Sequence, residues 1–265
     1  MDTIDQLTPD SVITVTGKVV ENDYVKMGGV EMIPESIEIE SIANALPIVR
    51  KEIAATKKKK AVERSSIDQR IDYRWIDLRT DENQLMFKAQ SCFVNAMRKF
   101  LLDRNFIEIH TPKLIAAASE SGSEVFKVDY FDRNAYLAQS PQFYKQMAMA
   151  AGFERIFETG PVFRAEKSYT NKHSTEFSGF DLEFSYITSY KDVMKMEEEL
   201  LTAGLQAVKD NYGDQIKEMF GQEVIVPTTP FPVVKLADLY KGLEEEFGYT
   251  VDESEKGDLT TEPSA

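Results

Sequence analysis

Apolar and polar positions alternate along residues 179–186, the most regular pattern in the chain. The apolar set is Phe180, Leu182, Phe184 and Tyr186, and the polar set is Gly179, Asp181, Glu183 and Ser185. A strand that is buried on one side only alternates with this period of two. Val162, Arg164 and Glu166 repeat at the same spacing. The pattern therefore predicts two strands joined by a polar loop.

A longer period runs through residues 83–104. The apolar residues that recur at three and four are Leu85, Ala89, Phe93, Ala96, Met97 and Phe100. This spacing predicts an amphipathic helix. A strand from Phe106 to His110 should follow and end at Thr111-Pro112. We expect the apolar face of the helix and this strand to be partly exposed in a single chain, as surfaces for a second copy.

Further strands are expected as two or three segments within residues 11–42, and at 124–131 and 135–138. Ser140 and Pro141 suit the N-cap and first position of a helix that Gly152 ends. Its apolar residues Phe143, Met147 and Ala150 should pack inward. Ser189 to Asp192 resembles a capping box. It should open a helix that reaches about Val208, and a last helix is expected near Leu236–Phe247. Antiparallel strands with helices beside them indicate an α+β fold.

The amino-acid composition excludes several classes of function. The 265 residues carry a formal charge of −14, which argues against nucleic-acid binding through the whole surface. One cysteine excludes a disulfide within the chain, and two distant histidines do not suit a zinc site. Without a signal-like N-terminus or a long apolar run, we expect a soluble, cytoplasmic chain and no membrane partner.

Three segments carry candidate chemistry, and each also has an ordinary structural explanation. Arg164 with the acids of the second strand could hold a triphosphate and an ammonium group, or could be a solvated charged face. Gln142 and Lys145 share one face of a helix start and could bind a carboxylate, or could belong to a capped surface helix. Glu120 lies in a Ser/Gly-rich loop that could close over a ligand, although any surface loop has this composition. The lysine run 57–60 could contact phosphates or form a solvated linker.

Together these segments resemble the aspartyl-tRNA synthetases of the archaeal and eukaryotic cytoplasmic type. Residues 85–114 are similar to class II motif 1, 163–183 to motif 2, and Gln139 to Lys145 to the amino-acid-binding helix. Residues 73–79 resemble the hinge. The resemblance implies an antiparallel class II catalytic sheet flanked by helices and preceded by a remnant of an OB β-barrel. The implied domains are 1–48 (OB remnant), 49–79 (hinge and linker) and 80–265 (first half of the catalytic domain).

The resemblance also implies a role for each matching residue. The activity would be that of an aminoacyl-tRNA ligase: aspartate and ATP form aspartyl-adenylate, and the aspartyl group passes to tRNA(Asp). Arg164 would be the catalytic residue, since it would neutralise charge at the α-phosphate. The implied ATP-binding residues are Arg164, Ala165, Glu166, Lys172, His173, Ser174 and Phe177. The implied aspartate-binding residues are Glu120, Ser140, Gln142, Lys145, Arg164 and Asp181. Glu166, Ser168 and Thr170 would meet the tRNA acceptor end, and Pro112 would lie at a homodimer interface.

The chain departs from the family pattern after motif 2. No arginine follows Arg164, so the glycine-rich third motif and its arginine have no counterpart. The family also implies Mg²⁺, whose ligands we expect outside this chain. The sequence thus predicts a fragment that lacks motif 3 and most of the OB domain. Two alternatives stay open: an inactive synthetase-like binding or dimerisation module, and an asparaginyl-tRNA synthetase.

Overall fold

The structure is a computed structural model that describes residues 4–25, 28–51, 63–117, 125–165, 174–252 and 257. The chain divides into two compact units, Met1–Phe87 and Lys88–Ala265. The division falls within helix α3 (Asp81–Leu102). Within the described ranges, no helix combines the length and apolar character needed to cross a membrane.

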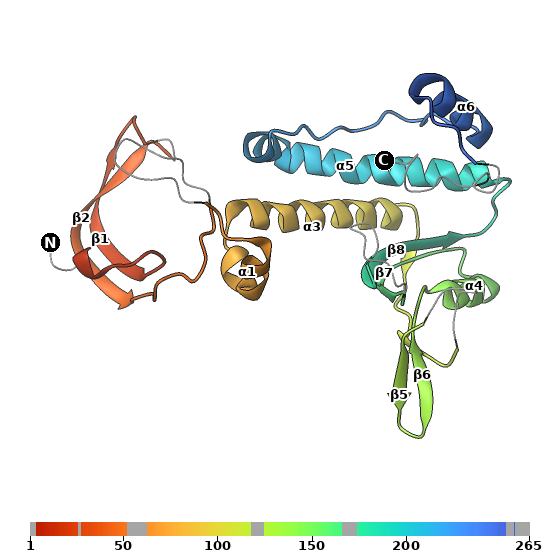
Figure 1. Cartoon of the computed structure of the whole chain (residues 1–265), viewed down its shortest axis with the longest axis horizontal. Coiled ribbons are helices and arrows are strands. Elements are labelled where there is room, and N and C mark those ends of the chain that lie inside the picture. Colours follow the sequence, from red (N-terminus) through yellow and green to blue (C-terminus); the bar gives the residue numbers. More distant parts are fainter. Residues whose placement is uncertain are drawn as a thin grey trace. The chain divides into compact units, whose positions relative to one another are not determined.

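The first unit contains a short 3-10 helix η1 (Ile4–Gln6) and a long antiparallel hairpin of β1 (Val12–Glu21) and β2 (Val30–Ser41) (Figure 1). The strands predicted in residues 11–42 are therefore present as two. Two short helices follow, α1 (Ile67–Asp72) and α2 (Arg74–Asp77). Asp77 is fully buried. Its carboxylate contacts Arg64 at 3.3 Å, Arg70 at 3.5 Å and Arg74 at 2.7 Å. This network joins α1, α2 and the segment before them.

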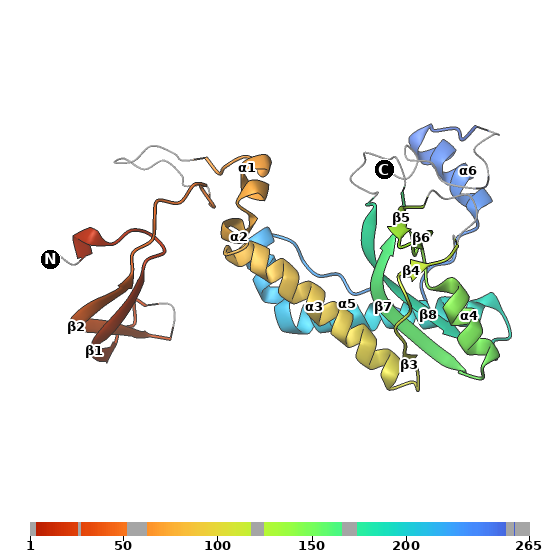
Figure 2. The same ribbon diagram turned by 90° about the horizontal axis from the view of Figure 1, so that it is seen from below.

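The core of the second unit lies between two helices and one face of a sheet. Buried Met97 and Leu101 of α3 and Leu200 of α5 (Tyr190–Phe220) pack together with Phe106 and Phe157. The two helices can approach closely because Gly204 of α5 faces Phe93 and Met97. Figures 1 and 2 show α3 and α5 side by side on one face of the sheet. The helix at 83–104 is thus confirmed. Leu85 and Met97 of its apolar face are buried, whereas Ala89, Phe93, Ala96 and Phe100 are only half-buried, so the face is partly exposed in the single chain, as expected. Tertiary packing within the chain already covers much of this apolar face.

That sheet has the order β3-β7-β8. β3 (Ile107–Glu108) pairs in parallel with β7 (Arg155–Phe163), and β8 (Glu176–Phe184) pairs antiparallel with β7. Phe180, Leu182 and Phe184 of β8 pack against the core, as their alternation predicted. Tyr186 does not continue this face, because the strand ends at Phe184 and Tyr186, with φ +62°, is 86 % exposed.

A second small sheet and helix α4 accompany the first. The second sheet has the order β4 (Leu114–Ile115), β6 (Arg133–Leu137), β5 (Lys127–Tyr130). Helix α4 (Gln142–Ala150) lies on the face of β7–β8 opposite α3 and α5 (Figures 1 and 2). The last helix is α6 (Leu236–Phe247). The α+β fold class is confirmed.

The observed helix ends agree with some of the predicted caps and differ from others. Gly152, with φ +87°, follows the end of α4, and Ser189 and Asp192 form the expected capping box of α5. Pro141 is the N-cap of α4 instead of its first helical residue. α5 continues to Phe220, well past Val208, and stops at Gly221 in the left-handed conformation that favours glycine.

The expected inward face of α4 was wrong. Phe143 and Met147 are 50 % and 56 % exposed, whereas Lys145 is 5 % exposed. The helix turns Lys145 towards acids on β8, and Met149, one turn further on, contacts Ser185 just after β8, whereas Phe143 and Met147 lie on the exposed side.

Candidate active site

The face of β7–β8 that points away from the core helices is polar. In the register, Glu158 is opposite Asp181, Gly160 is opposite Gly179, and Val162 is opposite Phe177. Residues directly opposite in an antiparallel pair point to the same face, and so do residues two apart on one strand. The polar face therefore carries three carboxylates at one end, Glu158, Asp181 and Glu183, and a bare glycine pair in the middle.

Lys145 reaches this face from α4. Its Nζ lies 3.1 Å from Oδ1 of Asp181 and 3.4 Å from Oε2 of Glu183, and its side chain is 7 % exposed. The helix start places it there: the backbone N–H of Gln142 donates to Oγ of Ser140 at 3.3 Å, one turn before Lys145. A buried ammonium with two carboxylates is a charged group held away from water by partners rather than a solvated surface lysine. Lys145 and Asp181, 36 residues apart in the sequence, are therefore in contact, and Ser140 and Gln142 lie at the start of the helix that carries Lys145.

Arg164 lies at the other end of the same face. Its backbone N–H donates to the carbonyl of Thr175 at 3.0 Å, which extends the β7–β8 ladder by one residue. Its guanidinium carbon is 5.7 Å from the centre of the Phe177 ring, a cation–π arrangement. Its Nε is buried without a hydrogen-bond partner. Because Phe177 and Asp181 are four residues apart on one strand, the two ends are separated by about 13 Å.

The structure adds a network at this face that sequence reasoning missed. Glu158 is 3 % exposed. Its carboxylate accepts hydrogen bonds from Thr111 N at 3.0 Å, Thr111 Oγ1 at 2.7 Å and Lys113 Nζ at 2.7 Å. Burial raises the pKa of Glu158, but the hydrogen bonds from Lys113 and Thr111 outweigh it and leave the pKa below its ordinary value. The only sequence signal was the period of two that links Glu158 to Gly160, Val162 and Arg164.

Other residues singled out in the sequence are placed less centrally or not at all. Ala165 is half-buried beside Arg164, while Ser174 and Pro112 are exposed. Six candidates lie outside the described residues: Glu120, Glu166, Ser168, Thr170, Lys172 and His173. Among the residues that are described, no group of three or more His, Cys, Asp or Glu side chains could hold a metal ion.

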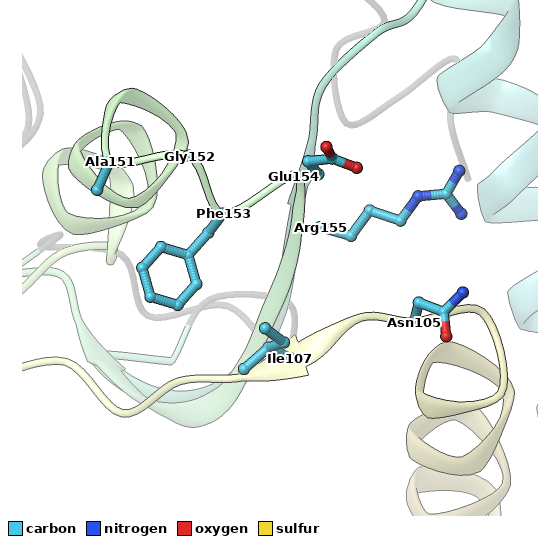
Figure 3. Close-up of a pocket in the computed structure, with 7 residues that line it drawn as sticks. All are labelled: Asn105, Ile107, Ala151, Gly152, Phe153, Glu154 and Arg155. Carbon is cyan, nitrogen blue, oxygen red and sulfur yellow. The ribbon is translucent and has the colours of Figure 1, made fainter.

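A hollow lies at the far end of β7, away from Arg164. It has a volume of about 580 Å³ and is lined by Asn105, Ile107, Ala151, Gly152, Phe153, Glu154 and Arg155 (Figure 3). Ile107 and Phe153 are 51 % and 42 % exposed. Arg155 and Arg164 are nine residues apart on an extended strand, a span of roughly 30 Å. The hollow is thus far from Arg164, but it lies near the other end of the polar face, because Arg155 is next to Ile156, the residue opposite Glu183.

Known proteins are similar to this chain in sequence and in fold. An aspartate–tRNA(Asp/Asn) ligase from Methanopyrus kandleri is 43 % identical over 269 residues, which cover 98 % of this chain and 60 % of that protein. The structure of an asparaginyl-tRNA synthetase from Pyrococcus horikoshii, complexed with asparaginyl-adenylate, superposes with a TM-score of 0.85 at 29 % identity, covering 99 % of this chain and 57 % of that one. An aspartyl-tRNA synthetase from Entamoeba histolytica gives a TM-score of 0.75 at 32 % identity, with 96 % and 52 % covered.

The matches extend over most of this chain but only part of each relative. The chain spans about half to three-fifths of the length of the curated relatives it matches. Residues 66–261 match the family described as tRNA synthetases class II (D, K and N). This range includes α4, β7 and β8 and hence every contact of the polar face described above. The chain belongs to the class II tRNA synthetases of the D, K and N group.

Proposed function

We propose that this protein is an aspartate–tRNA ligase. In the first step a carboxylate oxygen of L-aspartate attacks the α-phosphorus of ATP, a P–O bond to the β-phosphate breaks, and pyrophosphate leaves. In the second step a hydroxyl of the tRNA 3′ ribose attacks the carbonyl carbon of the aspartyl-adenylate, and AMP leaves. Both steps develop negative charge that positive side chains must stabilise.

The observation that carries the proposal is the buried Lys145 with Asp181 and Glu183. One ammonium beside two carboxylates complements a ligand that has both an ammonium group and a side-chain carboxylate. The ligand ammonium would be bound by the acids of β8, and its side-chain carboxylate by Lys145. A neutral amide would leave the lysine without an added partner, so this arrangement favours aspartate over asparagine.

Arg164 supports the nucleotide half of the proposal. It lies on the same face as Lys145, and its buried Nε–H makes no hydrogen bond within the protein, so it can donate to a ligand. In our proposal it neutralises the α-phosphate while Phe177, 41 % exposed, stacks on the adenine ring. The roles of Ala165 and Ser174 at ATP, and those of Glu120, Glu166, Ser168, Thr170, Lys172 and His173, rest on the family resemblance.

The wider assignments are parts of the same proposal. We place β1 and β2 in an OB-type domain over residues 1–48, a hinge at 49–79, and the catalytic domain from residue 80. tRNA(Asp) is the proposed macromolecular substrate and the cytoplasm the proposed location. A homodimer is supported by exposed Pro112 and by apolar residues of the same stretch of chain, since Leu102, Ile107 and Leu114 are each about half exposed.

The test is ATP–pyrophosphate exchange by the complete gene product with L-aspartate, with L-asparagine and without an amino acid. We expect exchange that depends on aspartate and exceeds that with asparagine. Arg164→Ala should lower the exchange rate even at saturating aspartate, because its charge is needed most in the transition state. Exchange that prefers asparagine would make the protein an asparaginyl-tRNA synthetase. Absence of exchange with either amino acid would instead favour a non-catalytic binding module.

A further inference from the structure

The polar face of β7–β8 holds two separate lysine–carboxylate groups. One consists of Lys145 with Asp181 and Glu183. The other consists of Lys113 with Glu158, whose ions lie 2.7 Å apart. Nothing in the proposed reaction requires the second group, although its carboxylate is more deeply buried than Asp181, with side-chain exposures of 4 % and 32 %.

The register places the two groups next to each other. Glu158 is the residue directly opposite Asp181. Side chains in such a position have Cβ atoms about 4.5–5.5 Å apart, and like charges there destabilise each other. Each carboxylate therefore needs its own cation. Thr111 fixes the arrangement further, because its backbone N–H and its hydroxyl both donate to Glu158.

The glycine pair beside them keeps both groups close to the backbone. A Cβ on Gly160 would lie 3.4 Å from Oε1 of Glu158 and 3.6 Å from Nζ of Lys113. A Cβ on Gly179 would lie 3.0 Å from Oδ2 of Asp181. Both charged groups therefore border the same side-chain-free patch of the sheet, the space between the Lys145 end and the Arg164 end.

We propose that Lys113 is a positioning residue for amino-acid selection: by neutralising Glu158 it leaves Lys145 available to Asp181 and to the side-chain carboxylate of the substrate. This inference rests on the proposed function, because it assumes that Lys145 receives that carboxylate. Lys113 acts through Glu158, and contact with substrate is not part of its role.

Loss of Lys113 would change the local charge in a defined way. The two lysines and three carboxylates sum to −1 with Lys113 present (two positive, three negative) and to −2 without it. An unpaired Glu158 would attract Lys145 and repel a second carboxylate nearby. Aspartate should therefore bind less well, while ATP, at the Arg164 end about 13 Å away, should be affected little.

The experiment uses the complete gene product and measures KM for aspartate, KM for ATP and kcat in pyrophosphate exchange. Calorimetric titration with L-aspartate alone, and the midpoint of thermal unfolding, are measured beside them. The variants are Lys113→Met, Glu158→Gln, the double variant and Lys113→Arg. Lys217→Met is the matched control, because Lys217 pairs with Glu223 in a site where both side chains are more than 60 % exposed.

We expect Lys113→Met to raise the aspartate KM and the calorimetric Kd at least tenfold, with kcat and the ATP KM changed less than threefold. Adding Glu158→Gln should restore most of the loss, since no unpaired carboxylate remains. Lys113→Arg should stay within threefold of the wild type, and Lys217→Met should not differ from it.

Two results would overturn the inference while leaving the proposed function intact. One is an aspartate KM for Lys113→Met equal to that of the wild type, whatever its unfolding midpoint. The other is a double variant as impaired as the single one, which would make the pair a purely structural support. A wild-type protein that neither binds nor activates aspartate would refute the proposed function, and with it this inference.

Discussion

Gly204→Ala tests the packing of α3 against α5, on which the placement of the sheet depends. Two opposing effects act at this position. Replacing glycine by alanine inside a helix stabilises it by about 1 kcal/mol, because glycine loses more backbone entropy on folding. The new methyl group, however, would lie 2.6 Å and 2.7 Å from Cε2 and Cδ2 of Phe93 and 3.1 Å from Cγ of Met97.

Those distances decide whether Gly204→Ala raises or lowers the free energy of unfolding. Contacts below 3.0 Å force the Phe93 ring or the helix to move, and Met97 is buried in the core. Overpacking of this kind costs about 1–3 kcal/mol. The helix-propensity gain offsets only part of it, so we expect the free energy of unfolding to fall or at best to stay unchanged.

Gly213→Ala is the matched control on the same helix. A Cβ there meets only Cγ of Lys209, at 3.6 Å, which is an ordinary contact. This variant should be stabilised only by the higher helix propensity of alanine, by about 1 kcal/mol. The difference between the two variants cancels propensity and isolates the steric cost, about 1–3 kcal/mol. Urea denaturation followed by circular dichroism measures it, and equal stabilisation by both substitutions would refute the described contact between α3 and α5.

Three other substitutions test separate parts of the structure. Asp77→Asn should lower the free energy of unfolding by about 1.5–3 kcal/mol at neutral pH, because three arginines lose their shared carboxylate. Burial raises the pKa of Asp77, but the neighbouring arginines lower it below its ordinary value overall. The stability that Asp77 contributes is therefore present above its unfolded-state pKa and lost as pH falls through the lower folded-state value, so the difference from Asn should shrink in acid. Ser189→Ala should cost about 1 kcal/mol in thermal or urea unfolding through loss of the α5 cap, and no loss would argue against the capping box. Ile107→Asp should weaken self-association in sedimentation, whereas Ile225→Asp, at a residue 80 % exposed, should not, and unchanged association in both would exclude Ile107 from an interface.

The alternation of apolar and polar residues predicted the helices and strands well where burial of one face determined the structure. The alternation around Asp181 gave both faces of β8 correctly, because a strand buried on one side must alternate. It failed at Tyr186, where the chain leaves the sheet and no partner strand maintains the period. Gly204 and Gly213 both lie within α5 without ending it, since a helix tolerates isolated glycines when the flanking turns are favourable.

The candidate site was partly visible in the sequence and partly not. Lys145 and Asp181 lie 36 residues apart, yet the family resemblance placed both in one aspartate site; the ion pair between them was not expected. Glu158 gave no such signal, because its partners Thr111 and Lys113 come from a segment more than 40 residues away. Long-range hydrogen bonds of this kind depend on sheet register, which period-two patterns alone do not specify. The exposure of Phe143 likewise depends on tertiary contacts that the helical period does not specify: the face of α4 with Lys145 and Met149 meets β8 and Ser185, and Phe143 lies on another face.

In the proposed enzyme, Lys145 selects the side-chain carboxylate of aspartate on the polar face of β7–β8. The measurement that tests it most directly is the aspartate KM of Lys145→Met in pyrophosphate exchange by the complete gene product. Loss of one member of a desolvated charge pair costs about 2–5 kcal/mol, which corresponds to a rise of tens- to thousands-fold. We predict such a rise with an unchanged ATP KM. An aspartate KM equal to that of the wild type and of Lys217→Met would show that Lys145 does not bind this carboxylate.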